Sequence, residues 1–269
     1  MQLSISNIAW DPKIDEEISE LLIENNISNI DIAPSKYFPD ISKVSKNQLR
    51  KVKSFWSGKG IKIYGMQSLF FGTKGMNIFG DMVSKKRMLN HFKKLSELGN
   101  EMGVKKLVFG SPMNRDCSLS KKSDVEKEAV EFFKELAVIV KDFEITICIE
   151  PVPKLYGCNF INTSAEAIKL IREINLPEIK LQLDLGSISI NKENIENIIT
   201  FERDLIGFVH ISEPNLMPIG TTGYAHKIYS ETIKKLDPNS IISIEMLTSN
   251  NKSINSIKNA IFFVKNNYF

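Results

Sequence analysis

Eight short apolar runs, each followed by a longer segment with helical periodicity, dominate the 269-residue sequence. The runs are rich in β-branched residues and almost continuously hydrophobic, which is typical of strands covered on both faces of a parallel sheet. They begin at Leu3, Ser28, Ile61, Lys105, Ile145, Lys180, Ile206 and Ile241. The alternation therefore predicts repeated β/α units.

The segments between the runs predict amphipathic helices. In 164–174 the apolar residues form one stripe, and Ser164 is the expected N-cap. Gly99 or Gly103 is expected to end the helix before the fourth run, because glycine readily adopts the left-handed C-cap conformation. The expected helices are 15–25, 45–58, 84–102, 123–141, 164–174, 192–200, 226–236 and 253–266.

The number of units predicts the fold class, which is α/β. Eight units in a chain of this length match a (β/α)₈ TIM barrel, which typically needs about 250 residues. No Pro-, Gly- or Ser-rich linker divides the chain, so we expect a single domain over residues 1–269. A doubly wound open sheet is the alternative, but no GxGxxG turn follows the first run and no Walker motif occurs.

Composition excludes several classes of function. The chain has 35 Lys and Arg against 32 Asp and Glu, and the resulting charge of +3 is too small to indicate nucleic acid or an anionic membrane as a partner. Its three cysteines form no CxxC motif, so a reducing cytoplasm is expected. No secretory signal is recognisable, and no apolar run approaches the roughly 20 residues of a membrane helix.

Charged side chains end the last four apolar runs. Glu150, Asp184, His210 and Glu245 follow one another at intervals of 34, 26 and 35 residues, each about one β/α unit. In a barrel they would project from successive strands onto one rim, where three carboxylates would repel one another unless a cation lies between them. The pattern predicts a metal site, although each residue could instead be an isolated helix cap or ion-pair partner.

The segments around these four residues resemble the xylose isomerase-like TIM barrels. This superfamily of sugar isomerases and epimerases includes ketose 3-epimerases, hydroxypyruvate isomerases, inosose dehydratases and the endonuclease IV repair enzymes. The resemblance extends over most of the chain and is strongest in IEPVPKLYGCNFINT (149–163), LQLDLGS (181–187), VHISEPNL (209–216) and SIEM (243–246).

The resemblance implies a role for each of the four residues. In the epimerases the matching positions bind one divalent metal ion, so Glu150, Asp184, His210 and Glu245 are the implied ligands, and the two glutamates are also the implied acid/base pair. Oxygen-rich ligation with one nitrogen suits Mn²⁺, Mg²⁺ or Co²⁺, with Zn²⁺ as another option. Such a metal would stabilise the enediolate formed when a proton leaves the carbon beside a carbonyl.

Three positions depart from the epimerase pattern. Tyr156 stands where the epimerases usually have a glutamate, Ser187 where they have a histidine, and Leu216 where they have an arginine. All three positions contact substrate in those enzymes. The implied metal-binding residues are therefore retained, but the substrate, or the reaction itself, can differ from that of the epimerases.

Other polar side chains on the same rim have a functional and a structural interpretation. Gln67, Tyr156, Asn159, Ser187 and Glu213 are candidate substrate contacts, Glu213 being equally a metal neighbour or a loop hydrogen-bonding group. Lys36 and Arg115 could bind a phosphate or carboxylate of the substrate, and Arg115 is the preferred candidate. His226 could lie next to the substrate, but a structural role is favoured for it. Phe70 and Phe71 could form a wall beside a sugar or pack beneath their loop.

The leading hypothesis is a metal-dependent sugar or sugar-phosphate isomerase or epimerase that acts on a small carbohydrate. A dehydratase of the same superfamily would use the same metal and base, and a non-catalytic sugar-binding barrel is the third possibility. The repair nucleases need three zinc ions with several histidine ligands, which a chain with three histidines cannot supply. A homo-oligomer is compatible with the sequence but cannot be derived from it.

Overall fold

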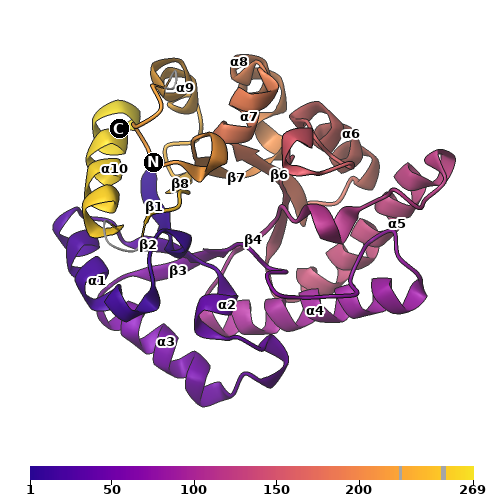
Figure 1. Ribbon diagram of the computed structural model, residues 1–269, viewed down its shortest axis with the longest axis horizontal. Helices are drawn as coiled ribbons and strands as arrows, with labels where there is room; N and C mark the ends of the chain where they lie inside the picture. The colour runs from indigo at the N-terminus through magenta and orange to yellow at the C-terminus, as the bar shows by residue number, and fades with distance from the viewer. Residues whose placement is uncertain (224–225, 250–252) are drawn as a thin grey trace.

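The computed structural model describes residues 1–223, 226–249 and 253–269. Its eight strands are all parallel and form a closed barrel in chain order, with β1 paired to both β2 and β8 (Figure 1). The strands are β1 (Gln2–Ser6), β2 (Asn29–Ile32), β3 (Lys62–Met66), β4 (Lys106–Phe109), β5 (Thr146–Ile149), β6 (Ile179–Asp184), β7 (Ile206–Ile211) and β8 (Ile241–Ile244). The predicted barrel is confirmed, and the open sheet is excluded.

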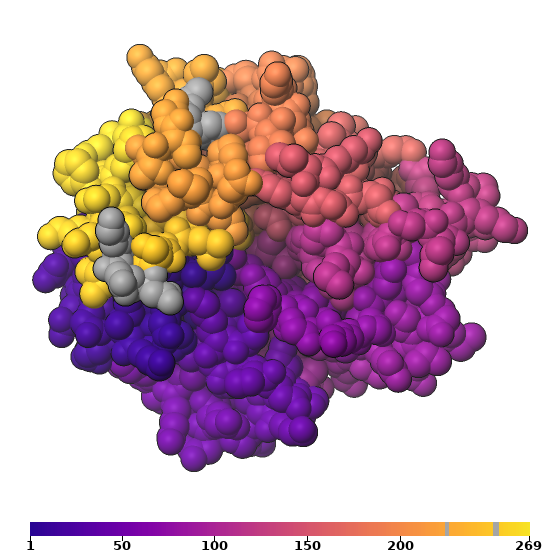
Figure 2. Space-filling view, in the orientation of Figure 1, coloured from indigo at the N-terminus to yellow at the C-terminus, as the bar shows by residue number. Residues whose placement is uncertain are grey.

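Helices surround the barrel on its outside, and the two chain ends lie close together in Figure 1. The space-filling view in Figure 2 shows the colours following one another around the molecule in chain order. The helices are α1 (Asp15–Glu24), α2 (Pro34–Tyr37), α3 (Lys46–Gly58), α4 (Met82–Met102), α5 (Lys122–Lys141), α6 (Ser164–Ile174), α7 (Leu185–Asn191), α8 (Ile195–Glu202), α9 (His226–Ile233) and α10 (Ser253–Tyr268). Among the described residues, no helix is long and apolar enough to cross a bilayer.

Most helix ends agree with the sequence to within three residues. Ser45 caps α3 with a complete capping box, and Gly103 ends α4 in the left-handed conformation at φ 88°. The expected Ser164 cap is wrong, because the Thr163 side chain accepts from the backbone N–H of Glu166 and Ser164 is the first helical residue.

The helix expected at 192–200 is also wrong in its bounds. Two helices occupy this region, α7 and α8, with a turn between them. Lys192 adopts a left-handed conformation at φ 55° and so ends α7, and Asn194 then caps α8 with its side chain. The short helix α7 starts immediately after Asp184, which places its first turn next to the rim.

The core has two parts because side chains alternate between the two faces of each strand. One set packs against the helices in a continuous apolar cluster that includes Ile5, Leu107 and Ile244. The other set faces the inside of the barrel, where Val108 and Phe208 belong to a separate small cluster. Polar residues follow this cluster toward the carboxyl ends of the strands. The strand register places them side by side, because Asp184 pairs with His210 and His210 pairs with Ser243.

Candidate metal centre

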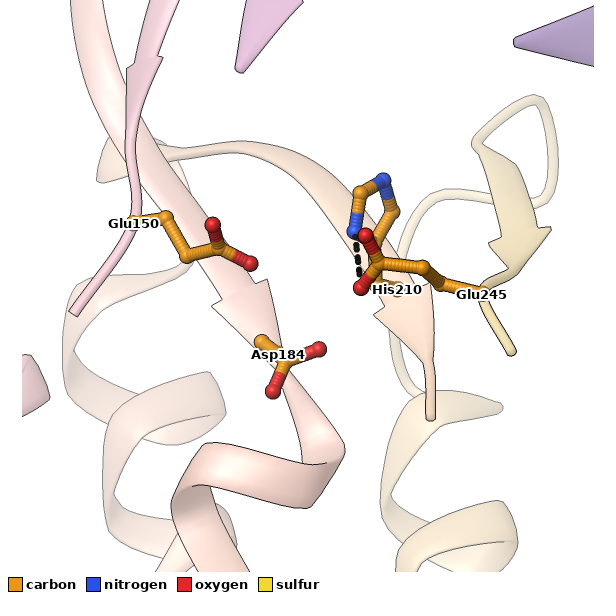
Figure 3. A group of neighbouring side chains, drawn as sticks. All are labelled: Glu150, Asp184, His210 and Glu245. Carbon is orange, nitrogen blue, oxygen red and sulfur yellow. Dashed lines mark ion pairs between the residues drawn. The ribbon is translucent and has the colours of Figure 1, made fainter. Parts of the chain in front are cut away.

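Four side chains from successive strand ends converge at one rim of the barrel. Glu150 directly follows β5, Asp184 is the last residue of β6, His210 lies near the end of β7, and Glu245 directly follows β8. Each offers a ligand atom, and these atoms all lie within 4.8 Å of one another. In Figure 3 the two glutamates enter from opposite sides, with Asp184 and His210 between them. We call these four residues the metal group.

Backbone pairing and one glycine place the glutamates. The backbone N–H of Glu150 donates to the carbonyl of Phe109 (3.0 Å), and that of Glu245 to the carbonyl of Ile211 (2.9 Å), so both continue the ladders of the barrel. A Cβ atom on Gly110 would lie 1.7 Å from Oε2 of Glu150. Gly110 therefore leaves the space that the Glu150 carboxylate occupies.

The crowding of three carboxylates shifts the pKa values of the residues in the metal group. Burial, together with the charges of Glu245 and Asp184, raises the pKa of Glu150 to about 8. Burial and Glu245 also raise the pKa of Asp184, although the Ser212 hydroxyl opposes this by hydrogen bonding. Burial lowers the pKa of His210, but facing carboxylates led by Glu245 outweigh it and raise that pKa to about 10. A cation between the carboxylates would relieve their repulsion.

The donor set fits one divalent metal ion. Opposite ligands of a metal bound at roughly 2.1 Å lie about 4.2 Å apart, so the spacing of the metal group needs only a small contraction. Within the described chain, neither ring nitrogen of His210 makes a hydrogen bond, although Nδ1 lies 3.1 Å from Oε2 of Glu245 (Figure 3). Three carboxylates and one imidazole suit Mn²⁺, Mg²⁺ or Co²⁺, with Zn²⁺ also accommodated.

A cavity of about 580 Å³ adjoins the metal group. Glu150 and Glu245 form part of its lining, together with Val108 of β4 and the loops after β3 and β4. Gln67, a predicted contact, lines it too and donates from Nε2 to Oε1 of Glu245. Both phenylalanines line the cavity, but Phe70 is also buried against Phe92 and Phe109, whereas Phe71 is 78% exposed.

Arg115 and Lys36 do not present free cations to the cavity. Arg115 is completely buried, donates from Nη2 to the backbone carbonyl of Glu150 (2.8 Å) and lies 5.4 Å from the ring centre of Phe109. The Lys36 ammonium donates to three backbone carbonyls of the loop after β1, those of Asn7, Ile8 and Trp10. Both side chains therefore hold backbone segments in place.

Glu213 and His226 form a second carboxylate–imidazole pair, separate from the metal group. Nε2 of His226 lies 3.1 Å from Oε1 of Glu213, and Nδ1 lies 2.8 Å from the Tyr268 hydroxyl. Glu213 also accepts from the backbone N–H groups of Gly220 and Thr222 and from the Thr222 hydroxyl. These contacts, which we call the loop network, tie the loop after β7 to α9 and α10.

The remaining candidates also have protein partners. Asn159 joins two loops, accepting from the backbone N–H of Cys117 and donating to Asp116. The Tyr156 hydroxyl accepts from the backbone N–H of Asn215 (2.7 Å), and the N–H of Ser187 donates to Asp184 (2.7 Å). Of these, Ser187 lies next to the metal group because α7 starts there. Whether any of them contacts substrate remains a prediction.

Sequence reasoning did not single out two residues that shape this rim, Gly110 and Ser212. Gly110 follows β4 in the pattern Phe-Gly-Ser-Pro, and a glycine at a strand end indicates close approach of another group. Ser212 donates to Oδ2 of Asp184 and accepts from the N–H of Gly186, so it fixes the aspartate from the neighbouring strand. A serine two residues after a predicted metal-ligating histidine carries no such signal.

Together these features define an eight-stranded parallel barrel with a carboxylate-rich group at the carboxyl ends of its strands, whose spacing fits one metal ion. Residues 20–266 match the family model of the xylose isomerase-like TIM barrels. The chain belongs to this family, as its resemblance implied.

Two curated relatives to which the chain is similar are sugar epimerases. The L-ribulose 3-epimerase of Methylomonas sp. (strain DH-1) is 27% identical over 121 residues, 45% of this chain and 42% of that protein. The D-psicose 3-epimerase of Enterocloster bolteae is 25% identical over 184 residues, 65% of this chain and 58% of that protein. The chain thus aligns with about half the length of these relatives.

A solved D-psicose 3-epimerase, crystallised in the presence of D-fructose, has the same fold. Its TM-score is 0.82 at 17% sequence identity, and the match covers 100% of this chain and 99% of that one. At this identity the likeness concerns the fold.

Proposed function

We propose that the protein is a divalent-metal-dependent sugar isomerase or epimerase that transfers protons at a carbon next to a carbonyl. The observation that carries the proposal is the pair of glutamates, Glu150 and Glu245, which face each other across the metal group and line the same cavity. The epimerase relatives support a carbohydrate as the substrate class.

The metal group would hold the cation through Glu150, Asp184, His210 and Glu245. A divalent cation bound there would polarise the carbonyl and a neighbouring hydroxyl of the sugar and acidify the hydrogen on the carbon between them. The oxygen-rich ligands favour Mn²⁺, Mg²⁺ or Co²⁺ over Zn²⁺.

The two glutamates carry out the proton transfer in this proposal. Glu150 accepts the proton on one face of the reacting carbon and acts as the general base. Glu245 returns a proton on the opposite face, which inverts the carbon or moves the carbonyl. The amide of Gln67 donates to Oε1 of Glu245 and so fixes its orientation.

A dehydratase is the second candidate, because loss of hydroxide after the same abstraction uses the same base and cation. The observation that favours it is the replacement of three substrate-contacting residues of the epimerases by Tyr156, Ser187 and Leu216. The Tyr156 hydroxyl is engaged with Asn215, and Leu216 offers no charge.

The test follows hydrogen exchange from heavy water. The Mn²⁺-loaded protein is incubated in D₂O with free ketoses, aldoses, their phosphates and inososes, and deuterium incorporation is measured by NMR. We expect incorporation next to the carbonyl of at least one sugar, falling by about 10²–10⁴-fold in Glu150→Gln because a general base has been removed. Loss of water without incorporation into the remaining sugar supports the dehydratase. Exchange at the wild-type rate in both Glu150→Gln and Glu245→Gln would overturn the proposal.

A further inference from the structure

A layer of polar side chains lies inside the barrel next to the metal group. Ser4, Asp31, Gln182 and Ser243 are all buried, on β1, β2, β6 and β8. By contrast, Val108 on β4 and Phe208 on β7 belong to a small apolar cluster. Branched apolar side chains usually fill this position in such barrels. Register joins the layer to the metal group, because Ser4 pairs with Ser243 and Ser243 with His210.

Asp31 is the charged member of this layer. The run SNIDIA from Ser28 is otherwise typical of a buried strand, and a carboxylate in its middle is the unexpected residue. A Cβ atom on Gly65, the residue paired with Asp31 on β3, would lie 2.5 Å from Oδ1 of Asp31. Gly65 thus leaves room for this carboxylate, as Gly110 does for that of Glu150.

The surroundings of Asp31 connect it to His210. The Phe208 ring is close to both residues: a Cβ atom on Gly65 would lie 2.5 Å from Oδ1 of Asp31 and 3.3 Å from the Phe208 ring, whose centre lies 5.3 Å from that of His210. Burial raises the pKa of Asp31 to about 6, and the charge of His210 is the main effect that opposes this rise. Asp31 is in turn among the carboxylates that act on the His210 ring. Of the described residues, four carboxylates are almost wholly buried, and Asp31 is the one that belongs neither to the metal group nor to the loop network.

The His210 ring needs a hydrogen-bond acceptor when its other edge binds a metal. Nδ1 is the nitrogen that faces Glu245, and Nε2 lies on the other side of the ring (Figure 3). In the described structure Nε2 has no hydrogen-bond partner, and neither does either oxygen of Asp31. A neutral imidazole that binds a cation through one nitrogen carries its proton on the other, and a buried N–H requires an acceptor.

We propose that Asp31 is a positioning residue for His210: its carboxylate accepts the Nε2 hydrogen through one water, and so fixes the ring and the tautomer that leaves Nδ1 to the metal. The proposal rests on the metal site of the proposed function and not on the identity of the sugar. It gives the interior layer a role in metal affinity.

The alternative is that Asp31 is only an unpaired buried carboxylate. Replacing it by a side chain of similar size would then raise stability or leave it unchanged without altering the metal site. The two roles therefore differ in metal affinity, which a stability measurement alone does not resolve.

The experiment compares Asp31→Leu and Asp31→Asn with Asn29→Ala by titration with Mn²⁺ and by thermal unfolding. Asn29 is the matched control, because it is a buried polar residue two positions earlier on the same strand, hydrogen-bonded to Gln2. We expect Asp31→Leu to bind Mn²⁺ about 10–100-fold more weakly, as loss of a residue behind a metal-ligating histidine does. Asp31→Asn retains a weaker acceptor and should show a smaller loss, and Asn29→Ala should bind Mn²⁺ as the wild type does.

A spectroscopic measurement separates positioning from general destabilisation. With three histidines in the chain, ¹⁵N NMR of the Zn²⁺-loaded protein can resolve each ring. We expect the Nε2–H tautomer at His210 in the wild type and a changed His210 signal in Asp31→Asn, with His91 and His226 unchanged.

The proposal is overturned if Asp31→Leu binds Mn²⁺ with the wild-type affinity. If Asp31→Leu does not fold, the proposal is overturned when Asp31→Asn has both the wild-type Mn²⁺ affinity and the wild-type His210 signal. Absence of Mn²⁺ and Zn²⁺ binding by the wild type instead overturns the metal site itself.

Discussion

Two buried glutamate–histidine pairs lie at the same end of the barrel, each with a nitrogen–oxygen distance of 3.1 Å. They differ in the charges and hydrogen-bond donors that surround them. His210 and Glu245 lie among further carboxylates, and in the described structure the ring of His210 makes no hydrogen bond. Glu213 and His226 are surrounded by donors that satisfy the carboxylate, and the ring also contacts the Tyr268 hydroxyl.

A buried glutamate–histidine pair therefore does not by itself identify a metal site. The loop network resembles other structural polar networks, in which every buried group has a partner and the segments involved become rigid. The metal group instead combines crowded like charges with unpaired nitrogens, which is unfavourable for a metal-free protein and suited to a cation. The two pairs therefore make opposite predictions for the same substitution.

The largest effect is expected from removing one carboxylate of each pair in turn. Glu245→Gln should lower deuterium exchange into the substrate by about 10²–10⁴-fold, because the group that returns the proton is lost. Glu213→Gln should leave exchange almost unchanged once the variant is folded. The rates are compared by NMR at saturating Mn²⁺, and equal losses in the two variants would remove the distinction between the pairs.

A smaller loss of exchange is expected when the metal group is disturbed from outside. In Gly110→Ala the new methyl group would collide with Oε2 of Glu150, so the carboxylate must move, and a displacement of this kind can slow a reaction by about 10²-fold. Gly58→Ala is the control, since nothing lies within 4 Å of a Cβ there. Wild-type exchange in Gly110→Ala would show that the Glu150 geometry is not required.

We expect the loop network to contribute to the free energy of unfolding. Glu213→Gln replaces an oxygen that accepts hydrogen bonds by an amide that donates, and a buried group left unsatisfied in this way costs about 1–3 kcal/mol. Urea unfolding of the metal-free protein measures the change, and Glu135→Gln on α5 is an exposed comparison. Unchanged stability in Glu213→Gln would mean that the network contributes nothing to the fold.

The smallest effect is expected at Lys36. In Lys36→Met the ammonium no longer donates to the three carbonyls after β1, and we expect a loss of about 1 kcal/mol in unfolding free energy. Exchange with every sugar, phosphorylated or not, should remain near the wild-type rate, and Lys13→Met serves as an exposed control. A selective loss of activity toward a sugar phosphate would restore Lys36 as an anion-binding residue.

The barrel and the members of the metal group could be predicted because each depends on local pattern. A strand buried on both faces must be continuously apolar, so a charged residue at its end, as at Glu150 or Asp184, stands out against the run before it. Repetition of that pattern in four successive units then places the charges on one rim, because parallel strands of a closed barrel end at the same edge.

What could not be predicted depends on partners that are distant in sequence. The position of the Arg115 side chain depends on the backbone carbonyl of Glu150, which accepts from its Nη2, and that of the Lys36 ammonium depends on the backbone carbonyls after β1. The bounds of α7 and α8 depend on the left-handed backbone of Lys192, a conformation that a lysine rarely adopts and the sequence does not indicate.

The amount of bound manganese in three proteins shows whether the metal group holds a cation. Wild-type protein, His210→Ala and His226→Ala are each equilibrated with Mn²⁺, separated from free ion, and assayed for manganese per chain. One ion per chain in the wild type and in His226→Ala, with loss of the ion in His210→Ala, is the predicted result. Manganese retained by His210→Ala at the wild-type level, or absent from the wild type, would contradict the assignment of the metal group.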